Sequence, residues 1–203
     1  EWHLAEQGLN LKRYPACYAA HRSIDAILDV VEEYDLQAAD IDRINVSTGH
    51  MQMLMLRNAS PQTALEAKFS LQFAMASAVV ARKVGLGQLV DEFVRDPTVQ
   101  SLFPRVSWTT TDETLDGSAF APSESVDVVT KDGRNLSSEV ITHAKGNMRR
   151  PLTEEALFEK FSDCLGRGYD LDRTRILFES LLRIENSGDI REIIQSICTD
   201  SAL

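Results

Sequence analysis

The chain has 203 residues, of which 43% are hydrophobic, so it can bury one substantial core or one domain with an appendage. Its 31 acidic side chains outnumber its 21 basic ones, and a net charge of -10 would repel a phosphate backbone, which argues against a nucleic-acid partner. No apolar run approaches the roughly 20 residues of a membrane span, and residues 1–6 lack the order of a signal peptide. We therefore expect a cytoplasmic protein without a membrane partner.

The cysteines and the short motifs argue against several classes of site. Cys17, Cys164 and Cys198 are far apart and lack the Cys-x-x-Cys spacing of a zinc or redox site, so we expect no metal. Cys164 and Cys198 are interpreted as buried free thiols. No Gly-x-Gly-x-x-Gly, phosphate-binding loop, Gly-x-Ser-x-Gly or His-Glu-x-x-His motif occurs. Nucleotide-binding, serine-hydrolase and zinc-protease functions therefore have no support.

The start of the chain is polar, and the first periodic segment follows it. The chain begins with Glu1 instead of an initiator methionine, which indicates truncation. A helix is predicted over residues 15–34, because Pro15 suits a first helical turn. Its apolar positions recur at helical spacing, and charged residues fill the remaining faces. The apolar set is Cys17, Ala20, Ile24, Ile27, Leu28 and Val31, and the charged set is Arg22, Asp25, Asp29 and Glu33.

The middle of the chain alternates between strand and helix patterns. Residues 43–48 alternate as a half-buried strand that Gly49 stops, and the following residues 49–53 are interpreted as a loop. A long helix is predicted over residues 60–83, with small side chains that allow close packing. Two shorter helices follow at residues 88–94 and 97–103, the second with Asp96 as its cap.

The next segments predict a small sheet. Val106, Trp108 and Thr110 alternate as a strand, and residues 125–130 and 136–142 are two β-rich runs. Asp132-Gly133 lies between these runs and is a strong hairpin signal. Residues 11–143 therefore combine helices with a small, mostly antiparallel sheet, and the fold class is α+β.

The character of the chain changes at residues 145–151, beyond which no strand pattern occurs. Helices are predicted over residues 154–165, 171–184 and 189–198. The apolar faces of this all-helical tail, including Ile176, Leu177, Leu181 and Ile184, need a partner surface.

The stretch from Lys12 to His21 contains the best candidates for a binding site. Lys12 and Arg13 precede a helix start whose free N–H groups favour anions. Cys17 and His21 are four residues apart, which would place them on one side of that helix. Together these side chains could hold a carboxylate. In the alternative interpretation, the two cations are solvated and His21 is an ordinary polar core residue.

Three blocks of the sequence resemble the MmgE/PrpD family, which includes 2-methylcitrate dehydratase. Lys12-Arg13-Tyr14-Pro15-Ala16-Cys17-Tyr18-Ala19-Ala20-His21 resembles the motif Lys-x-Tyr/Phe-Pro-x-(Cys or His)-x-x-x-His that opens the family's lid-like domain. Glu66-Ala67-Lys68-Phe69-Ser70-Leu71-Gln72-Phe73 is similar to its Glu-Ala-Lys-Phe-Ser helix. Lys145-Gly146 with Arg150-Pro151-Leu152-Thr153 and Lys160-Phe161 is similar to its segment leaving the lid.

The resemblance implies an N-terminal helical domain, then a lid domain, then helices that return to the helical domain. Residues 1–10 would be a polar lead-in from a missing helical domain, residues 11–147 the α+β lid, and residues 148–203 the returning helices. Substrate, typically a di- or tricarboxylate, would lie between the two domains, and no cofactor is implied. Homodimers are usual in the family, so the expected partners are a small carboxylate, the helical domain and a second copy.

The same resemblance implies roles for individual residues. Lys12, Arg13, Tyr14 and His21 would bind substrate, while Cys17 and His21 would line the pocket or assist catalysis. The base and acid would lie at least partly on the missing helical domain. Some relatives have His at the position of Cys17, and some have Tyr in the loop where this chain has His50. His50 would contact substrate in place of that tyrosine or remain an exposed loop histidine, and Lys68 would form an interdomain ion pair or remain solvated.

Two functions follow as expectations. In the first, the chain is the C-terminal part of a MmgE/PrpD-like dehydratase, decarboxylase or epimerase, most nearly a carbon–oxygen lyase like 2-methylcitrate dehydratase, and is inactive alone. In the second, it is a non-catalytic interaction or accessory module that docks through its helical tail.

Overall fold

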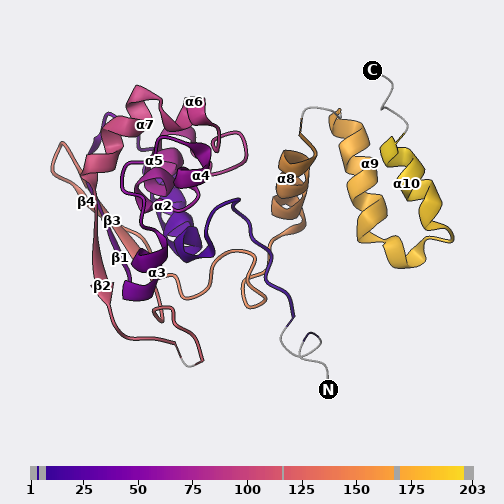
Figure 1. Ribbon diagram of the computed structural model, residues 1–203, viewed down its shortest axis with the longest axis horizontal. Helices are drawn as coiled ribbons and strands as arrows, with labels where there is room; N and C mark the ends of the chain where they lie inside the picture. Colours follow the sequence, from indigo (N-terminus) through magenta and orange to yellow (C-terminus); the bar gives the residue numbers. More distant parts are fainter. Residues whose placement is uncertain (1–3, 5–7, 116, 167–169, 199–203) are drawn as a thin grey trace. The chain divides into compact units, whose positions relative to one another are not determined.

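The computed structural model describes residues 4, 8–115, 117–166 and 170–198, without the side chains of Ser196 and Cys198. The chain divides into two compact units, Glu1–Pro151 and Leu152–Leu203 (Figure 1). The first contains a mixed sheet packed with helices, and the helices of the second lie at the C-terminal end of the chain. The predicted α+β class is therefore confirmed.

The sheet of the first unit has four strands in the order β2-β1-β3-β4. The strands are β1 (Ile41–Gly49), β2 (Val106–Thr111), β3 (Ser125–Thr130) and β4 (Asn135–Ser137). β1 pairs with β2 in parallel, while the β1–β3 and β3–β4 pairs are antiparallel. The parallel pair needs a long crossover, and the helices between residues 50 and 105 supply it.

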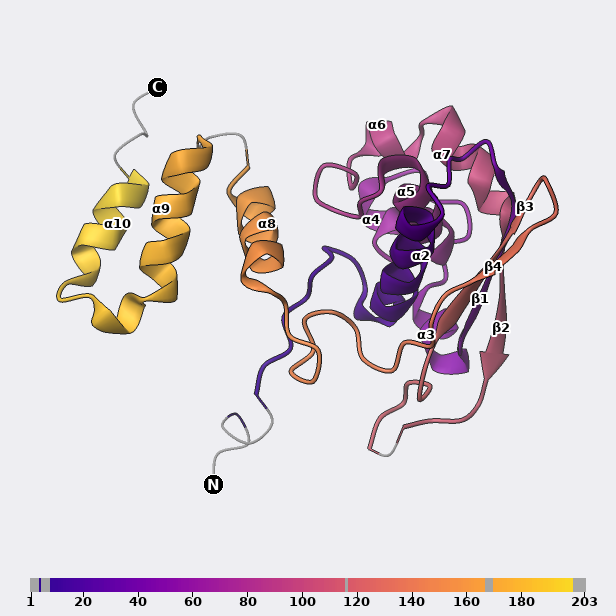
Figure 2. The ribbon, with the colours of Figure 1, turned by 180° about the vertical axis from the view of Figure 1, so that it is seen from behind.

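Two helices, α2 (His21–Glu33) and α5 (Leu71–Ala81), cover one face of this sheet, as both ribbon views show (Figure 2). The core lies between the two layers and contains the fully buried Ile24, Phe73, Ile44 and Val128. On the other face of the sheet, the half-buried Ser47 and the exposed Thr109 lie side by side with their hydroxyl oxygens 3.2 Å apart. One face of the sheet is thus packed and the other meets solvent, which accounts for the alternation along β1 and β3.

The helical part of the first block begins later than predicted. Cys17 has extended backbone angles (φ -57°, ψ 133°), a 3-10 turn (η1, Tyr18–Ala20) follows it, and α2 starts at His21. The prediction that Cys17 and His21 share a face of one helix is therefore wrong. The Cys17 N–H donates instead to the Lys68 carbonyl, 2.8 Å away.

The single helix predicted over residues 60–83 is two helices, α4 (Ala64–Ala67) and α5. Thr63 and Glu66 form a capping box at the start of α4, and the Ser70 hydroxyl accepts a hydrogen bond from the Phe73 N–H at the start of α5. Both caps stabilise new helix starts inside the apolar periodicity. The periodic pattern alone could not distinguish this break from a continuous helix.

The connections contain one further correction and two confirmations. Residues 50–55 form a helix, α3 (His50–Met55), where a loop was predicted. The helices α6 (Asp91–Val94) and α7 (Pro97–Leu102) lie within their predicted ranges, and Asp96 caps α7. The hairpin between β3 and β4 is confirmed, with Gly133 at φ +88° in its turn, although β4 ends at Ser137.

The second unit is helical, as predicted: α8 (Glu154–Leu165), α9 (Leu171–Leu182), a 3-10 turn (η4, Ile184–Asn186) and α10 (Ile190–Cys198). Phe158 and Phe161 pack their rings 5.3 and 5.4 Å from that of Phe178. The prediction of a buried Cys164 is wrong, because its side chain is exposed on the last turn of α8. The side chain of Cys198 lies outside the described residues.

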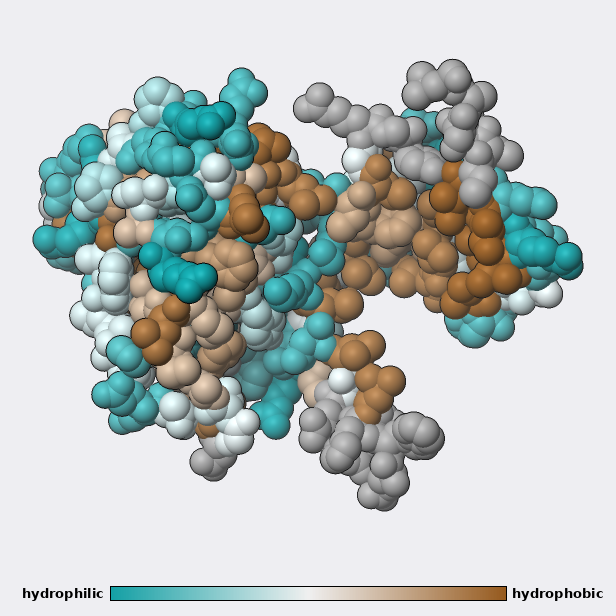
Figure 3. All heavy atoms as spheres, viewed as in Figure 1, coloured by the Kyte–Doolittle hydropathy of each residue, from teal (hydrophilic) through white to brown (hydrophobic). Residues whose placement is uncertain are grey.

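Several large apolar side chains of this unit meet solvent (Figure 3). They are Leu171, Ile176, Leu182, Ile184, Ile190, Ile194 and Ile197. Leu177 packs inside the unit instead, with 4% exposure. Among the described helices of the whole chain, none is both long and apolar enough to cross a membrane.

Gly49 provides a test of the packing where β1 meets α3. A Cβ atom at this position would lie 2.9 Å from the Ala121 Cβ and 3.0 Å from the Ala121 nitrogen, as well as against the Gln52 amide. Overpacking of this kind costs about 1–3 kcal/mol, so we expect Gly49→Ala to lower the free energy of unfolding by that amount. Urea denaturation measures the change. Gly87→Ala is the control, because no atom lies within 4 Å of its added Cβ. Equal stabilities for the two variants would contradict the packing argument.

Candidate functional site

The three sequence blocks meet beside the N-terminal half of α2. The N–H of Leu11, the residue before the first block, donates to the carbonyl of Gly146 at 2.8 Å and so ties the start of that block to the third. The bond from Cys17 to Lys68 joins the first block to the second. Residues 11–17 are therefore a short, mainly non-helical segment held at both ends by the other two blocks.

Asp25 on α2 lies at the centre of this arrangement and is fully buried. Its Oδ1 accepts a hydrogen bond from the Tyr14 hydroxyl at 2.6 Å. Its Oδ2 accepts the backbone N–H of Lys145 at 2.6 Å and lies 3.5 Å from Arg150 Nη1. One turn further along α2, Asp29 pairs with Lys145 Nζ at 2.7 Å and lies 3.9 Å from Arg150. Two carboxylates of α2 thus face two cations of the third block.

Burial dominates the protonation behaviour of this cluster. Desolvation raises the pKa of Asp25, and the hydrogen bonds from Tyr14 and from the Lys145 backbone only partly oppose that rise. Desolvation, followed by the nearby charge of Asp25, also raises the pKa of Tyr14. Tyr14 therefore remains a hydrogen-bond donor at neutral pH and does not act as a base.

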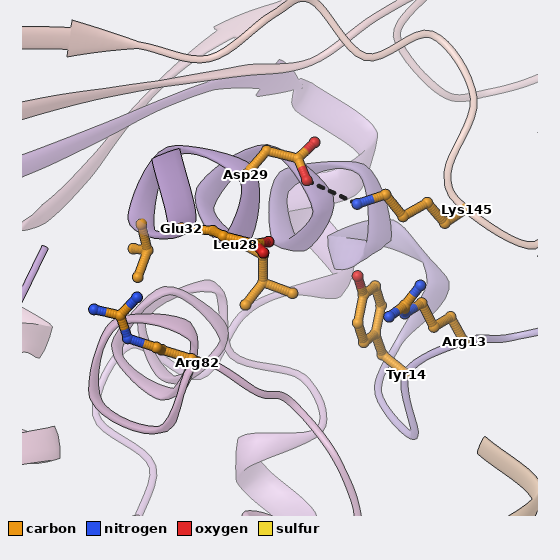
Figure 4. A pocket seen from close by; sticks show the side chains of 8 residues that line it. Arg13, Tyr14, Leu28, Asp29, Glu32, Arg82 and Lys145 are labelled. Carbon is orange, nitrogen blue, oxygen red and sulfur yellow. Dashed lines mark hydrogen bonds and ion pairs between the residues drawn. The ribbon is translucent and has the colours of Figure 1, made fainter. Parts of the chain in front are cut away.

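A cavity of about 280 Å³ lies beside this cluster (Figure 4). Its lining residues are Arg13, Tyr14, Leu28, Asp29, Val31, Glu32, Arg82 and Lys145. Lys145 points toward Asp29, and the Arg13 guanidinium lies 5.8 Å from the centre of the Tyr14 ring. Arg82 pairs with Asp35 at 2.5 Å. Carboxylates of the chain itself therefore neutralise much of the positive charge around this cavity.

Lys12 differs from these cations. Its side chain is exposed and does not line the cavity, and its ammonium lies 3.4 Å from the Ala16 carbonyl. Lys68 is half-buried, and its backbone carbonyl accepts a hydrogen bond from the N–H of Cys17 in the same segment. Across the described residues, neither lysine forms an ion pair with a carboxylate. Cys17, whose N–H donates to the Lys68 carbonyl, is also half-buried.

The two histidines predicted for the site have different environments. His21 is fully buried, and its ring centre lies 5.2 Å from that of Tyr14 and 4.9 Å from that of Tyr18. In this structure it is part of the packed interior behind residues 12–17. His50 is exposed at the first position of α3, the helix that contacts η1.

A second buried polar cluster was missed by the sequence analysis. Glu124 is 2% exposed and accepts hydrogen bonds from Arg22 Nε at 3.2 Å and Gln52 Nε2 at 3.1 Å, as well as from the Ser23 hydroxyl. Arg22 also donates to the Ala121 carbonyl at 2.9 Å. Helical spacing had assigned Arg22 and Asp25 to polar faces, whereas both are buried. No sequence motif indicates the cluster, because Glu124 lies 72 to 102 residues from its partners.

The described residues contain no group of three or more His, Cys, Asp or Glu side chains that could hold a metal ion.

The raised pKa of Asp25 predicts a specific pH dependence of stability. The folded chain keeps this proton at pH values where the unfolded chain, with a pKa of about 3.9, has lost it. The stability that Asp25 contributes is thus fully present below that value and falls as the pH rises toward the folded pKa. Asp25→Asn removes this pH-dependent contribution to the free energy of unfolding, because the amide does not titrate in this range. We therefore expect the variant to gain stability relative to the wild type as the pH rises above about 4.

Urea denaturation at several pH values between 4 and 7 measures this difference. The exposed Asp42 provides the control substitution, Asp42→Asn. A stability difference between wild type and Asp25→Asn that stays constant over this range would contradict the expectation.

Comparison with known proteins identifies the family of the chain. The model of the MmgE/PrpD C-terminal domain matches residues 14–184 of the chain. A search of curated proteins finds no match. The matched range includes Tyr14, Cys17, His21 and His50, and it begins two residues after Lys12. Because this range covers most of the sequence, the chain belongs to the MmgE/PrpD family and carries its C-terminal domain.

Proposed function

We propose that the chain is the substrate-binding lid of an enzyme that acts on a di- or tricarboxylate. The proposed reaction is elimination of water, as in 2-methylcitrate dehydratase, with decarboxylation and epimerisation as related alternatives. The proposed base and acid lie at least partly on an N-terminal helical domain, so the chain alone is inactive. The observation that carries the proposal is the pair of lysines, Lys12 and Lys68, beside Cys17.

These lysines are the best-placed cations for an external anion. Lys12 and Lys68 both lie along the peptide that joins Ala16 to Cys17, one through its ammonium and one through its carbonyl. The cations of the two buried clusters contact Asp25, Asp29 or Glu124 instead. In a chain with 31 acidic side chains, two lysines without a carboxylate partner in the described part favour an anionic ligand.

The chemistry assigned to the enzyme fits this arrangement. Removing a proton next to a carboxylate generates enolate-like charge, which nearby cations stabilise in a closed site. Lys12 and Lys68 would supply these cations. A general base takes the proton and a general acid assists the leaving hydroxyl. Cys17 would line the substrate pocket, while Tyr14 and His21 would support the segment from its buried side.

Replacing Lys12 tests the proposal in a protein that combines this chain with the helical domain. Lys12→Ala should lose roughly 1.5–3 kcal/mol of substrate or transition-state interaction, or about ten- to a hundredfold in kcat/KM. The thermal midpoint should hardly move, because the side chain is exposed. Steady-state kinetics on di- and tricarboxylates provides the measurement, with Lys68→Ala as a companion variant.

The exposed turn residue Lys131 provides the matched control, Lys131→Ala. If Lys12→Ala and Lys131→Ala have equal kcat/KM on the best substrate, Lys12 does not bind the carboxylate.

A second candidate function is a docking module, and the exposed apolar side chains of the second unit favour it. Leu171 and Ile176 are each 67% exposed, and Ile190 and Ile194 are 53% and 49% exposed. Large apolar side chains exposed together on one small unit are typical of interaction sites. The proposed partners are the helical domain and a second copy of the chain.

We expect the chain to self-associate through this surface. Multi-angle light scattering should report a mass above the 22.7 kDa of the monomer. Ile176→Ser combined with Ile194→Ser should shift the mass toward the monomer. Leu65→Ser removes an equally exposed apolar side chain from the first unit and should leave the mass unchanged. A wild-type chain that remains monomeric at high concentration would exclude self-association.

A further inference from the structure

We infer that Asp25 is a positioning residue, which anchors residues 12–17 to residues 145–150 and so determines where Lys12 presents its ammonium. The anchoring stands on contacts within the chain. Only its importance for binding rests on the proposed function.

The two carboxyl oxygens of Asp25 accept hydrogen bonds from different segments. Oδ1 accepts from the Tyr14 hydroxyl, while Oδ2 accepts from the Lys145 N–H and faces Arg150. Asp25 and Lys145 are 120 residues apart in the chain. One carboxyl therefore joins α2 to two segments that lie at opposite ends of the first unit's sequence.

Hydrogen bonds to other parts of the chain hold residues 11–17 in place. The backbone bonds of Leu11 to Gly146 and of Cys17 to Lys68 secure the two ends. Between these two ends, a buried hydrogen bond from the Tyr14 hydroxyl to Asp25 connects the segment to α2. Tyr14 is only 4% exposed, whereas Lys12 two residues earlier is exposed. Holding Tyr14 from the inside thus sets the outward position of Lys12.

A carboxyl group at the buried position of Asp25 is energetically unfavourable when it is charged. Burial raises the pKa of Asp25, so its environment disfavours the charged form. Replacing such buried groups with apolar side chains is often neutral or stabilising, so stability alone does not explain their presence. A geometric role explains why a fully buried position on α2 carries a group that can accept bonds from two directions.

The thiol of Cys17 provides a direct readout of this segment. It is half-buried at the end of residues 12–17, and Cys164→Ser with Cys198→Ser removes the two other thiols. The reaction rate of Cys17 with Ellman's reagent then reports how often the segment opens. We expect Asp25→Asn to raise this rate about tenfold, the effect of losing one buried hydrogen bond of ordinary strength.

Tyr14→Phe should produce a similar increase, because it removes the hydroxyl that donates to Asp25 and preserves the ring. In Asp25→Asn, the single amide oxygen cannot accept from both the Tyr14 hydroxyl and the Lys145 N–H. Tyr14→Phe also keeps the test decisive if Asp25→Asn does not fold. Glu124→Gln is the matched control, since Glu124 is another buried carboxyl group against α2, and among the described residues its hydrogen bonds come from Arg22, Ser23 and Gln52. Urea is used to bring all variants to the same free energy of unfolding before rates are compared.

Faster labelling in Asp25→Asn and Tyr14→Phe than in Glu124→Gln at equal stability supports positioning. Equal rates in all three overturn it, because Asp25 would then contribute stability alone. This measurement involves no substrate, so it is independent of the Lys12→Ala kinetics. An unchanged kcat/KM in Lys12→Ala contradicts the proposed function. Equal Cys17 labelling rates in the three variants contradict the anchoring role of Asp25.

Discussion

The enclosure of the first half of α2 is the constraint on which the first unit depends. Residues 21–27 are buried on every side of the helix, although Arg22 and Asp25 have ionisable side chains. A buried charge without partners is strongly unfavourable, so each must find them inside the protein. Asp25 finds them in the first and third blocks, and Arg22 finds Glu124. The requirement for buried polar groups to be satisfied thus draws distant segments onto one helix.

This requirement also separates two kinds of cation. Those near α2 are committed to carboxylates of the chain and hold the architecture together. Lys12 and Lys68 lie outside that network, along a segment which the network supports. The cations of the same sequence blocks therefore differ in whether carboxylates of the chain itself hold them. A change at a supporting residue can then affect residues 12–17 without altering Lys12 itself.

Local patterns in the sequence predicted the elements whose determinants are local. Asp96-Pro97 marked the start of α7, and Asp132-Gly133 marked the hairpin. The break between α4 and α5 was missed, because its capping residues lie inside an uninterrupted apolar periodicity. For the site, residue types and family resemblance identified the stretch from Lys12 to His21. The burial of His21 agrees with the alternative interpretation of a polar core residue. The burial of Asp25 and Arg22 was not predictable, because it depends on partners about 100 or more residues away.

The break at Ser70 has a further consequence for folding. In a continuous helix, the carbonyl of Lys68 would accept the N–H of Gln72 and would be unavailable to Cys17. The cap at Ser70 leaves that carbonyl exposed for a partner from another part of the chain. The alanine-rich sequence around it favours continuous helix, so local preference and tertiary structure conflict at this point. Substitutions that improve helix propensity here would strengthen a competing conformation in which the first and second blocks are no longer joined.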